Sequence, residues 1–157
     1  AKVVDLGAAP GGWSQVAAQK TAPGGRVIAI DLLEVAPMSG VTVLRGDVRD
    51  AEVQSQVAAA LGGDKADAVL SDLSPNLSGI ASADQARAAE LVRMAMDFSR
   101  ARLQAQGALL VKVFQGAEFA GLLKEMKSIF REVRTLKPAA SREESRETYL
   151  LARGLKG

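Results

Sequence analysis

The chain has 157 residues, of which 48% are hydrophobic, and its formal net charge is +2. This length fits one domain, covering residues 1–157, and no apolar run approaches the roughly 20 residues that a membrane span requires. Cysteine and histidine are absent, which excludes a disulfide framework, a cysteine-ligated zinc site, a cysteine nucleophile and a histidine general base. We expect a soluble, cytoplasmic protein that binds no metal and acts as a monomer.

The first half of the chain alternates strand-like and helix-like stretches. Strands are predicted over residues 2–6, 26–31 and 41–45, with a helix over 13–20 after the first strand and a helix over 51–61 after the third. The chain therefore opens directly on a strand with central, buried character. Because domains rarely begin with their most buried strand, we expect a further segment to precede it in the complete protein.

The second half continues this alternation. It predicts a strand over 66–71, a long helix over 83–104 that ends at Gly107, a strand over 108–114 and a helix over 118–130. Two final strands, over 132–136 and 148–152, have no helix between them and should pair as an antiparallel hairpin at one sheet edge. The pattern predicts an α/β fold with a mostly parallel sheet and helices on both faces.

Glycines follow the first predicted strand, where open α/β sheets bind ligands. Gly7, Gly11 and Gly12 allow the backbone to approach a ligand closely, and Trp13 follows them at the start of the predicted helix. A dinucleotide-binding loop is one reading of such a segment. It is less favoured, since Pro10 stands third after Gly7 and the spacing is not that of the dinucleotide motif GxGxxG.

Carboxylates end the next two strands. Asp31 lies about twenty residues past the glycines, where an acidic residue accepts hydrogen bonds from a ribose diol. Asp47 ends the following strand and could accept from the amine of adenine. Either residue alone reads equally well as a turn or cap residue, but together with the glycines they indicate an adenosine-containing ligand.

Lys112 interrupts the apolar strand at 108–114, where an unpaired ammonium is costly to bury. It either reaches along the surface to solvent or faces Asp72, which follows the fourth strand. Glu147 brings a second carboxylate to the same edge. In the same part of the chain, residues 131–157 hold seven basic and four acidic residues, a mildly basic segment compatible with RNA.

These motifs together resemble the FtsJ/RrmJ family of ribosomal RNA ribose 2′-O-methyltransferases. The matching stretches are DLGAAPGGWSQ (5–15), VIAIDLLE (27–34), GDVRD (46–50), SDLSPNLSG (71–79), VKVFQG (111–116) and SRETY (145–149). The resemblance covers almost the whole chain in the expected order. It implies the Rossmann-like fold of methyltransferases that use S-adenosylmethionine, a seven-stranded sheet whose last strand is antiparallel.

Carried over to this sequence, the resemblance implies contacts to S-adenosylmethionine from Gly7, Gly11, Trp13, Asp31, Asp47 and Asp72. It also implies catalytic roles for Asp72, Lys112 and Glu147, three members of the family's Lys-Asp-Lys-Glu set. The first lysine of that set lies upstream of the glycine loop in the family and has no counterpart here. Lys112 would act either as a base on the ribose hydroxyl or, while charged, as a stabiliser of the forming alkoxide.

The expected substrate is a uridine ribose in large-subunit ribosomal RNA. A transfer RNA or an mRNA cap is the alternative among enzymes, because relatives share the same constellation. A non-catalytic RNA-binding relative is the alternative outside enzymes, and the presence of Asp72, Lys112 and Glu147 argues against it. Methylation of a base is less favoured, because the fourth strand is followed by Asp-Leu-Ser-Pro.

Overall fold

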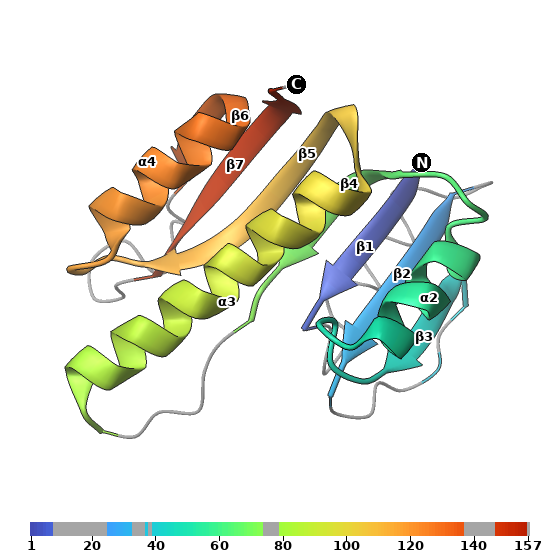
Figure 1. Cartoon of the computed structure of the whole chain (residues 1–157), viewed down its shortest axis with the longest axis horizontal. Coiled ribbons are helices and arrows are strands. Elements are labelled where there is room, and N and C mark those ends of the chain that lie inside the picture. The colour runs from blue at the N-terminus through green and yellow to red at the C-terminus, as the bar shows by residue number, and fades with distance from the viewer. Residues whose placement is uncertain (8–24, 33–36, 38, 74–78, 137–146, 157) are drawn as a thin grey trace.

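The computed structural model describes residues 1–7, 25–32, 37, 39–73, 79–136 and 147–156. Within them the chain forms the strands β1 (Lys2–Leu6), β2 (Arg26–Asp31), β3 (Val41–Arg45), β4 (Ala66–Ser71), β5 (Leu103–Phe114), β6 (Phe130–Leu136) and β7 (Glu147–Leu155) (Figure 1). The helices are α2 (Ala51–Ala60), α3 (Ala81–Arg102) and α4 (Phe119–Ile129). Each predicted strand is confirmed within a few residues, except that β5 begins five residues early. The helix predicted over 13–20 lies outside the described residues.

The strands form one seven-stranded sheet in the order β3-β2-β1-β4-β5-β7-β6. β1 to β5 pair in parallel, whereas β7 runs antiparallel to both β5 and β6, as predicted for the final hairpin. From β1 the order runs towards β3 on one side and towards β4 and β5 on the other. This reversal places the topological switch point between β1 and β4, where α/β sheets bind their ligands.

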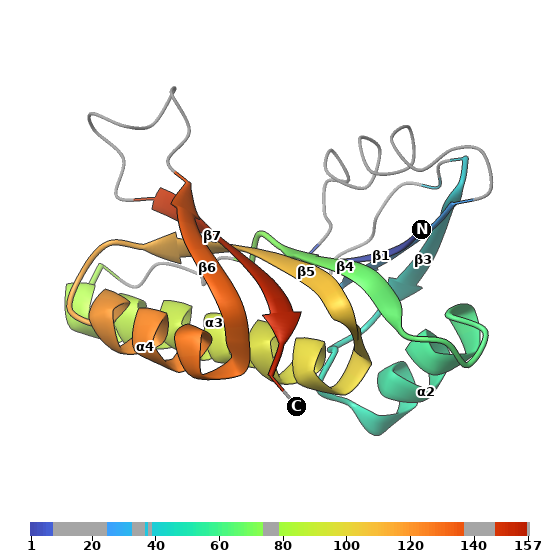
Figure 2. The ribbon, with the colours of Figure 1, turned by 90° about the horizontal axis from the view of Figure 1, so that it is seen from above.

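The three helices that the structure describes all lie on one face of the sheet (Figure 2), so the predicted covering of both faces is not tested by the described residues. The main core lies between them and the strands, with Ile28, Val111 and Leu150 pointing in from the sheet and Met96 and Leu122 from the helices. Buried and half-buried residues alternate along β5 and β7, as strand geometry requires. Lys112 lies between the buried Val111 and Val113, so its side chain leaves the sheet on the opposite face.

One boundary of the long helix differs from the prediction. α3 ends at Arg102, β5 begins at Leu103, and Gly107 lies inside β5 rather than ending the helix. A Cβ at Gly107 would overlap the Leu103 side chain and lie 3.0 Å from the carbonyl oxygen of Asp67. Glycine is therefore needed here for close strand packing, a tertiary requirement that resembles a helix-stop signal in the sequence.

No helix in the described part of the chain is both long enough and apolar enough to cross a membrane. The 22-residue α3 has sufficient length, but it carries charged residues, including Asp84, Arg93 and Arg100.

Candidate active site

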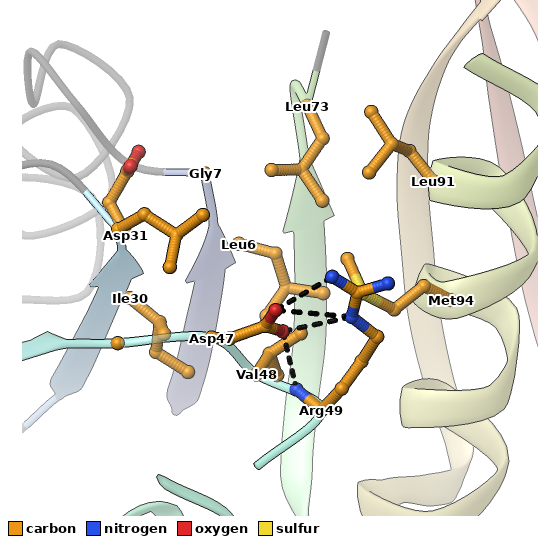
Figure 3. Close-up of a pocket in the computed structure, with 12 residues that line it drawn as sticks. Leu6, Gly7, Ile30, Asp31, Asp47, Val48, Arg49, Leu73, Leu91 and Met94 are labelled. Carbon is orange, nitrogen blue, oxygen red and sulfur yellow. Dashed lines mark hydrogen bonds and ion pairs between the residues drawn. The ribbon is translucent and has the colours of Figure 1, made fainter. Parts of the chain in front are cut away.

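A pocket of about 90 Å³ lies at the switch point, beyond the carboxyl ends of β1, β2 and β4 (Figure 3). Gly7 and Asp31 line it beside the ends of β1 and β2, and Asp47 lines it two residues after β3. Leu6, Ile30, Val48, Leu73, Leu91 and Met94 form most of its remaining wall. The pocket thus combines apolar walls with two carboxylates, a composition suited to a nucleoside.

Gly7 allows the first strand to end in close contact with the fourth. Its φ is +71°, a left-handed conformation that side chains other than glycine rarely adopt, and a Cβ there would overlap the side chain of Leu73. Its amide donates a hydrogen bond of 2.8 Å to the carbonyl of Ile30. The ends of β1, β2 and β4 are consequently held close together, which leaves bare backbone on the pocket wall at Gly7.

Asp31 and Asp47 both line the pocket, as their positions at strand ends predict. The Asp31 side chain lies beside Gly7 and points away from Asp47 (Figure 3), while the Asp31 carbonyl accepts a hydrogen bond of 2.9 Å from Gly46. The two carboxylates therefore lie at different parts of the pocket, as binding of two separate groups on one ligand would require.

Asp47 already has a close partner in Arg49. The Arg49 side chain donates from Nε to Oδ1 at 3.0 Å and from Nη2 to Oδ2 at 2.7 Å, and the Arg49 amide donates to Oδ1 at 2.9 Å. These hydrogen bonds hold the pKa of Asp47 below its usual value. Arg49 is not among the site residues predicted from the sequence. The Asp-x-Arg spacing is the one feature of the sequence that could have indicated the contact with Asp47, because a tight turn can bring residue i+2 back over residue i.

Lys112 forms the second polar cluster at this edge of the sheet. Its Nζ lies 3.2 Å from Oδ1 of Asp72 and 3.9 Å from Oε1 of Glu147, and its side chain is only 10% exposed. Nζ also lies 5.7 Å from the centre of the Phe114 ring. Lys112 therefore does not reach out to solvent. It is an almost fully buried ammonium held by two carboxylates, the arrangement in which burying its charge is tolerable.

Tyr149 completes this cluster, and no role was predicted for it. It lies opposite Lys112 in the β5–β7 pairing, and its hydroxyl donates to Oδ1 of Asp72 at 3.3 Å. Burial raises the pKa of the Tyr149 hydroxyl to about 12, and the negative charge of Asp72 adds to the shift. Tyr149 thus remains a neutral hydrogen-bond donor at the pH of most enzyme reactions.

Lys112, Asp72, Glu147 and Tyr149 form what we call the lysine cluster. This cluster and the pocket meet at two consecutive residues, because Asp72 belongs to the cluster and Leu73 lines the pocket. The structure brings Gly7, Asp31 and Asp47 together around the pocket, and Asp72, Lys112 and Glu147 together beside it. Asp72 itself pairs with Lys112 and is one residue away from the pocket lining. Gly11 and Trp13 lie outside the described residues.

The sequence matches the FtsJ-like methyltransferase family over residues 1–155. The chain belongs to this family. It is 52% identical over 155 residues to the ribosomal RNA large subunit methyltransferase E of Chromohalobacter salexigens, covering 99% of this chain and 74% of that protein. The protein of the same name from Dechloromonas aromatica is 49% identical, with 98% of this chain and 75% of that protein covered. The resemblance inferred from the motifs is confirmed.

Solved structures agree with the FtsJ-like fold. A protein described as a ribosomal RNA methyltransferase of Plasmodium falciparum superposes with a TM-score of 0.88 at 26% identity, covering 99% of this chain and 87% of that one. Human methyltransferase-like protein 13, solved with S-adenosylhomocysteine, superposes with a TM-score of 0.65 at 12% identity, covering 97% and 71%. The predicted methyltransferase fold, with its antiparallel last strand, is therefore confirmed.

Proposed function

We propose that this FtsJ-like methyltransferase transfers a methyl group from S-adenosylmethionine to the ribose 2′-hydroxyl of a uridine in large-subunit ribosomal RNA. The observation that carries the proposal is the buried Lys112 ammonium, held by Asp72 and Glu147 next to a pocket with two carboxylates. The names of the relatives at about half identity support the ribosomal substrate. We further propose action in the cytoplasm, as a monomer and without a metal ion.

We propose that the pocket receives the adenosine part of the cofactor. The bare backbone at Gly7 and the apolar walls suit a flat base and a sugar, while Asp31 suits the ribose diol and Asp47 the adenine amine. Gly11 and Trp13 of the glycine loop lie outside the described residues, and we propose them as further contacts. When bound, S-adenosylmethionine supplies an electrophilic methyl group on a positively charged sulfur.

Lys112 is the residue we propose to act on the acceptor hydroxyl. A ribose hydroxyl is a poor nucleophile near neutral pH, so it must lose its proton or have its developing negative charge stabilised. Asp72 and Glu147 pair with the Lys112 ammonium, at 3.2 Å and 3.9 Å from Nζ. This favours charge stabilisation of the forming alkoxide as the role of Lys112, with a base role as the alternative.

Asp72, Glu147 and Tyr149 position Lys112. Asp72 lies closer to Nζ than Glu147 does, at 3.2 Å against 3.9 Å, and it also accepts the Tyr149 hydroxyl. Asp72 is thus fixed from two sides and orients the ammonium more tightly than Glu147. We expect Asp72→Asn to reduce turnover more than Glu147→Gln. We also propose that Asp72 contacts the cofactor's methionyl amine, since Leu73 beside it lines the pocket.

The proposal is tested by incubating the complete protein with methyl-labelled S-adenosylmethionine and large ribosomal subunits from cells that lack the endogenous modification. The labelled RNA is then hydrolysed with alkali. A 2′-O-methyl group blocks alkaline cleavage at its own nucleotide, because that cleavage needs the free 2′-hydroxyl. We expect the label in an alkali-resistant dinucleotide that contains uridine.

Parallel reactions contain transfer RNA or capped mRNA in place of ribosomal subunits. Label in those RNAs alone would replace the ribosomal substrate with one of these classes. Label recovered as a methylated base in an ordinary mononucleotide would overturn ribose methylation. Protein that binds the cofactor but labels none of the three RNAs would support a non-catalytic RNA-binding relative.

A further inference from the structure

The hydrogen-bonding capacity of Asp47 is largely used within the protein. A carboxylate offers about four acceptor positions, and Arg49 directs three donor groups at the two oxygens of Asp47. The Asp47 side chain is only 23% exposed, so its remaining lone pair is poorly accessible to a further hydrogen-bond donor. An adenine amine that approaches Asp47 from the pocket therefore competes with the Arg49 side chain.

Arg49 lies on the border between two hollows. The first is the pocket at the switch point, and the second is an open groove of about 550 Å³ between α3 and the segment that joins β3 to α2. Both are lined by Val48, Arg49, Leu91 and Met94. Figure 3 shows the Arg49 guanidinium between Asp47 and Met94. Its side chain is 67% exposed, so packing restrains it little in this position.

The groove offers Arg49 a second carboxylate. Glu90 projects from α3 into the groove lining and is exposed. The hydrogen bond to Asp47 is the main cause that raises the pKa of Arg49, and the negative charge of Glu90 adds to it. Among the residues that the structure describes, Glu90 forms no ion pair, whereas Arg93, also in the groove, pairs with Glu125 at 3.1 Å. Arg49 can therefore leave Asp47 and still have a carboxylate in the groove that it lines.

We propose that Arg49 sets the affinity of the adenosine pocket by exchanging between Asp47 and Glu90. Without adenosine, Arg49 holds Asp47. When the adenine amine donates to Asp47, the guanidinium moves into the groove and is received by Glu90. This inference rests on the proposed function, since it takes the pocket to be the adenosine site.

Removing Arg49 should therefore tighten binding of adenosine. Exposed ion pairs contribute little each, so losing this competitor should lower the dissociation constant of adenosine by about two- to five-fold. Calorimetry on the Arg49→Met variant measures this, because methionine keeps the apolar stem and removes only the charged head. Adenosine is the probe since it carries no charge that Arg49 could attract or repel.

Arg93→Met is the matched control, because it removes another arginine from the lining of the same groove without touching Asp47. Its adenosine affinity should equal that of the wild type. The Glu90→Gln variant tests the second half of the exchange, the movement of Arg49 to Glu90. It should weaken adenosine binding about two-fold in the wild type, since Arg49 loses its alternative partner, and should have no effect in the Arg49→Met background.

Salt provides a readout that a purely structural role of Arg49 would not give. Salt screens the Asp47–Arg49 pair, so adenosine should bind the wild type more tightly as salt rises from 0.02 M to about 0.5 M, relative to Arg49→Met. Weaker binding by Arg49→Met would overturn the exchange and show that Arg49 contacts the base. An unchanged affinity together with an unchanged salt response would also overturn it. If the wild type binds no adenosine or S-adenosylhomocysteine, the proposed function fails instead.

Discussion

At the scale of single residues, the site depends on one buried charge. Lys112 is 10% exposed and its ammonium is held by Asp72 and Glu147. Burying an ion pair generally costs as much solvation as the attraction returns, so such a group is a poor device for stability alone. Its position beside the pocket is what gives the arrangement a chemical use.

Replacing Lys112 by alanine should remove most turnover while leaving cofactor affinity within a few-fold of the wild type. Loss of a general base typically costs about 10²–10⁴-fold in rate, and loss of one electrostatic stabiliser a similar amount. Methylation of ribosomal subunits by the complete protein, with calorimetry on S-adenosylhomocysteine as the binding control, measures both. Turnover at the wild-type rate would make Lys112 a structural residue.

The Lys112→Arg variant distinguishes the two proposed roles of Lys112. Arginine stays charged near neutral pH and cannot act as a base, although it differs from lysine in shape. Substantial turnover in this variant would favour stabilisation of the alkoxide by a fixed positive charge. The same methylation assay reports it, with Lys124→Arg on the exposed face of α4 as a control for the substitution itself.

Tyr149 offers a direct measurement of the electrostatics, because it is the only tyrosine in the chain. We expect its hydroxyl to ionise with a pKa of about 12. The ultraviolet absorbance of the tyrosinate measures this ionisation. Asp72→Asn should lower that midpoint, though not to the ordinary value, because burial is the larger cause. Since the folded pKa is raised, this group stabilises the fold fully below about pH 10 and loses that contribution as pH rises towards 12. A midpoint near 10 in the wild type would contradict the contact with Asp72.

At the scale of secondary-structure elements, the ends of strands position the pocket. Gly7 ends β1 in a left-handed conformation against Leu73, and this contact joins the ends of β1 and β4. The pairing of β5 with β7 brings Tyr149 opposite Lys112 and Glu147 opposite Phe114. The antiparallel last strand therefore supplies half of the lysine cluster.

Gly7→Ala should destabilise the fold by about 1–3 kcal/mol and weaken binding of S-adenosylhomocysteine, because the new Cβ is strained and overlaps Leu73. Gly121→Ala is the matched control. Gly121 lies in α4 with open space around its missing Cβ, so alanine there should stabilise the fold by about 0.4–1 kcal/mol. Urea denaturation compares the two variants. Equal stability of Gly7→Ala and the wild type would show that this strand end tolerates a side chain.

At the scale of the whole molecule, the fold brings the pocket and the cluster around Lys112 to one edge of the sheet. A ligand that binds only the folded state stabilises it, by about 2.7 kcal/mol at a concentration 100 times its dissociation constant. We expect S-adenosylhomocysteine to raise the thermal midpoint of the wild type. Asp31→Ala and Asp47→Ala should bind it more weakly by calorimetry. Unchanged affinity in both variants would refute the placement of ribose and adenine.

NAD should not bind competitively with S-adenosylmethionine. The spacing after Gly7 is not GxGxxG, because Ala9 stands where that motif has its second glycine. Thermal midpoints measured with and without NAD test this expectation. Saturable binding of NAD at micromolar concentrations, reversed by S-adenosylmethionine, would contradict it.

The sequence by itself determined the order and type of the elements, because apolar periodicity reports directly which segments are buried strands and helices. It also identified Asp31, Asp47, Asp72 and Lys112, since each breaks an apolar strand or stands at or just after its end, and Glu147, which comes just before the last predicted strand. Parallel strands bring such positions to one edge whatever their separation along the chain. Only the tertiary structure decided which of these residues meet. The β5–β7 register placed Tyr149 against Asp72, a turn closed Arg49 onto Asp47, and strand packing required Gly107, because each depends on distances between segments that sequence spacing does not encode.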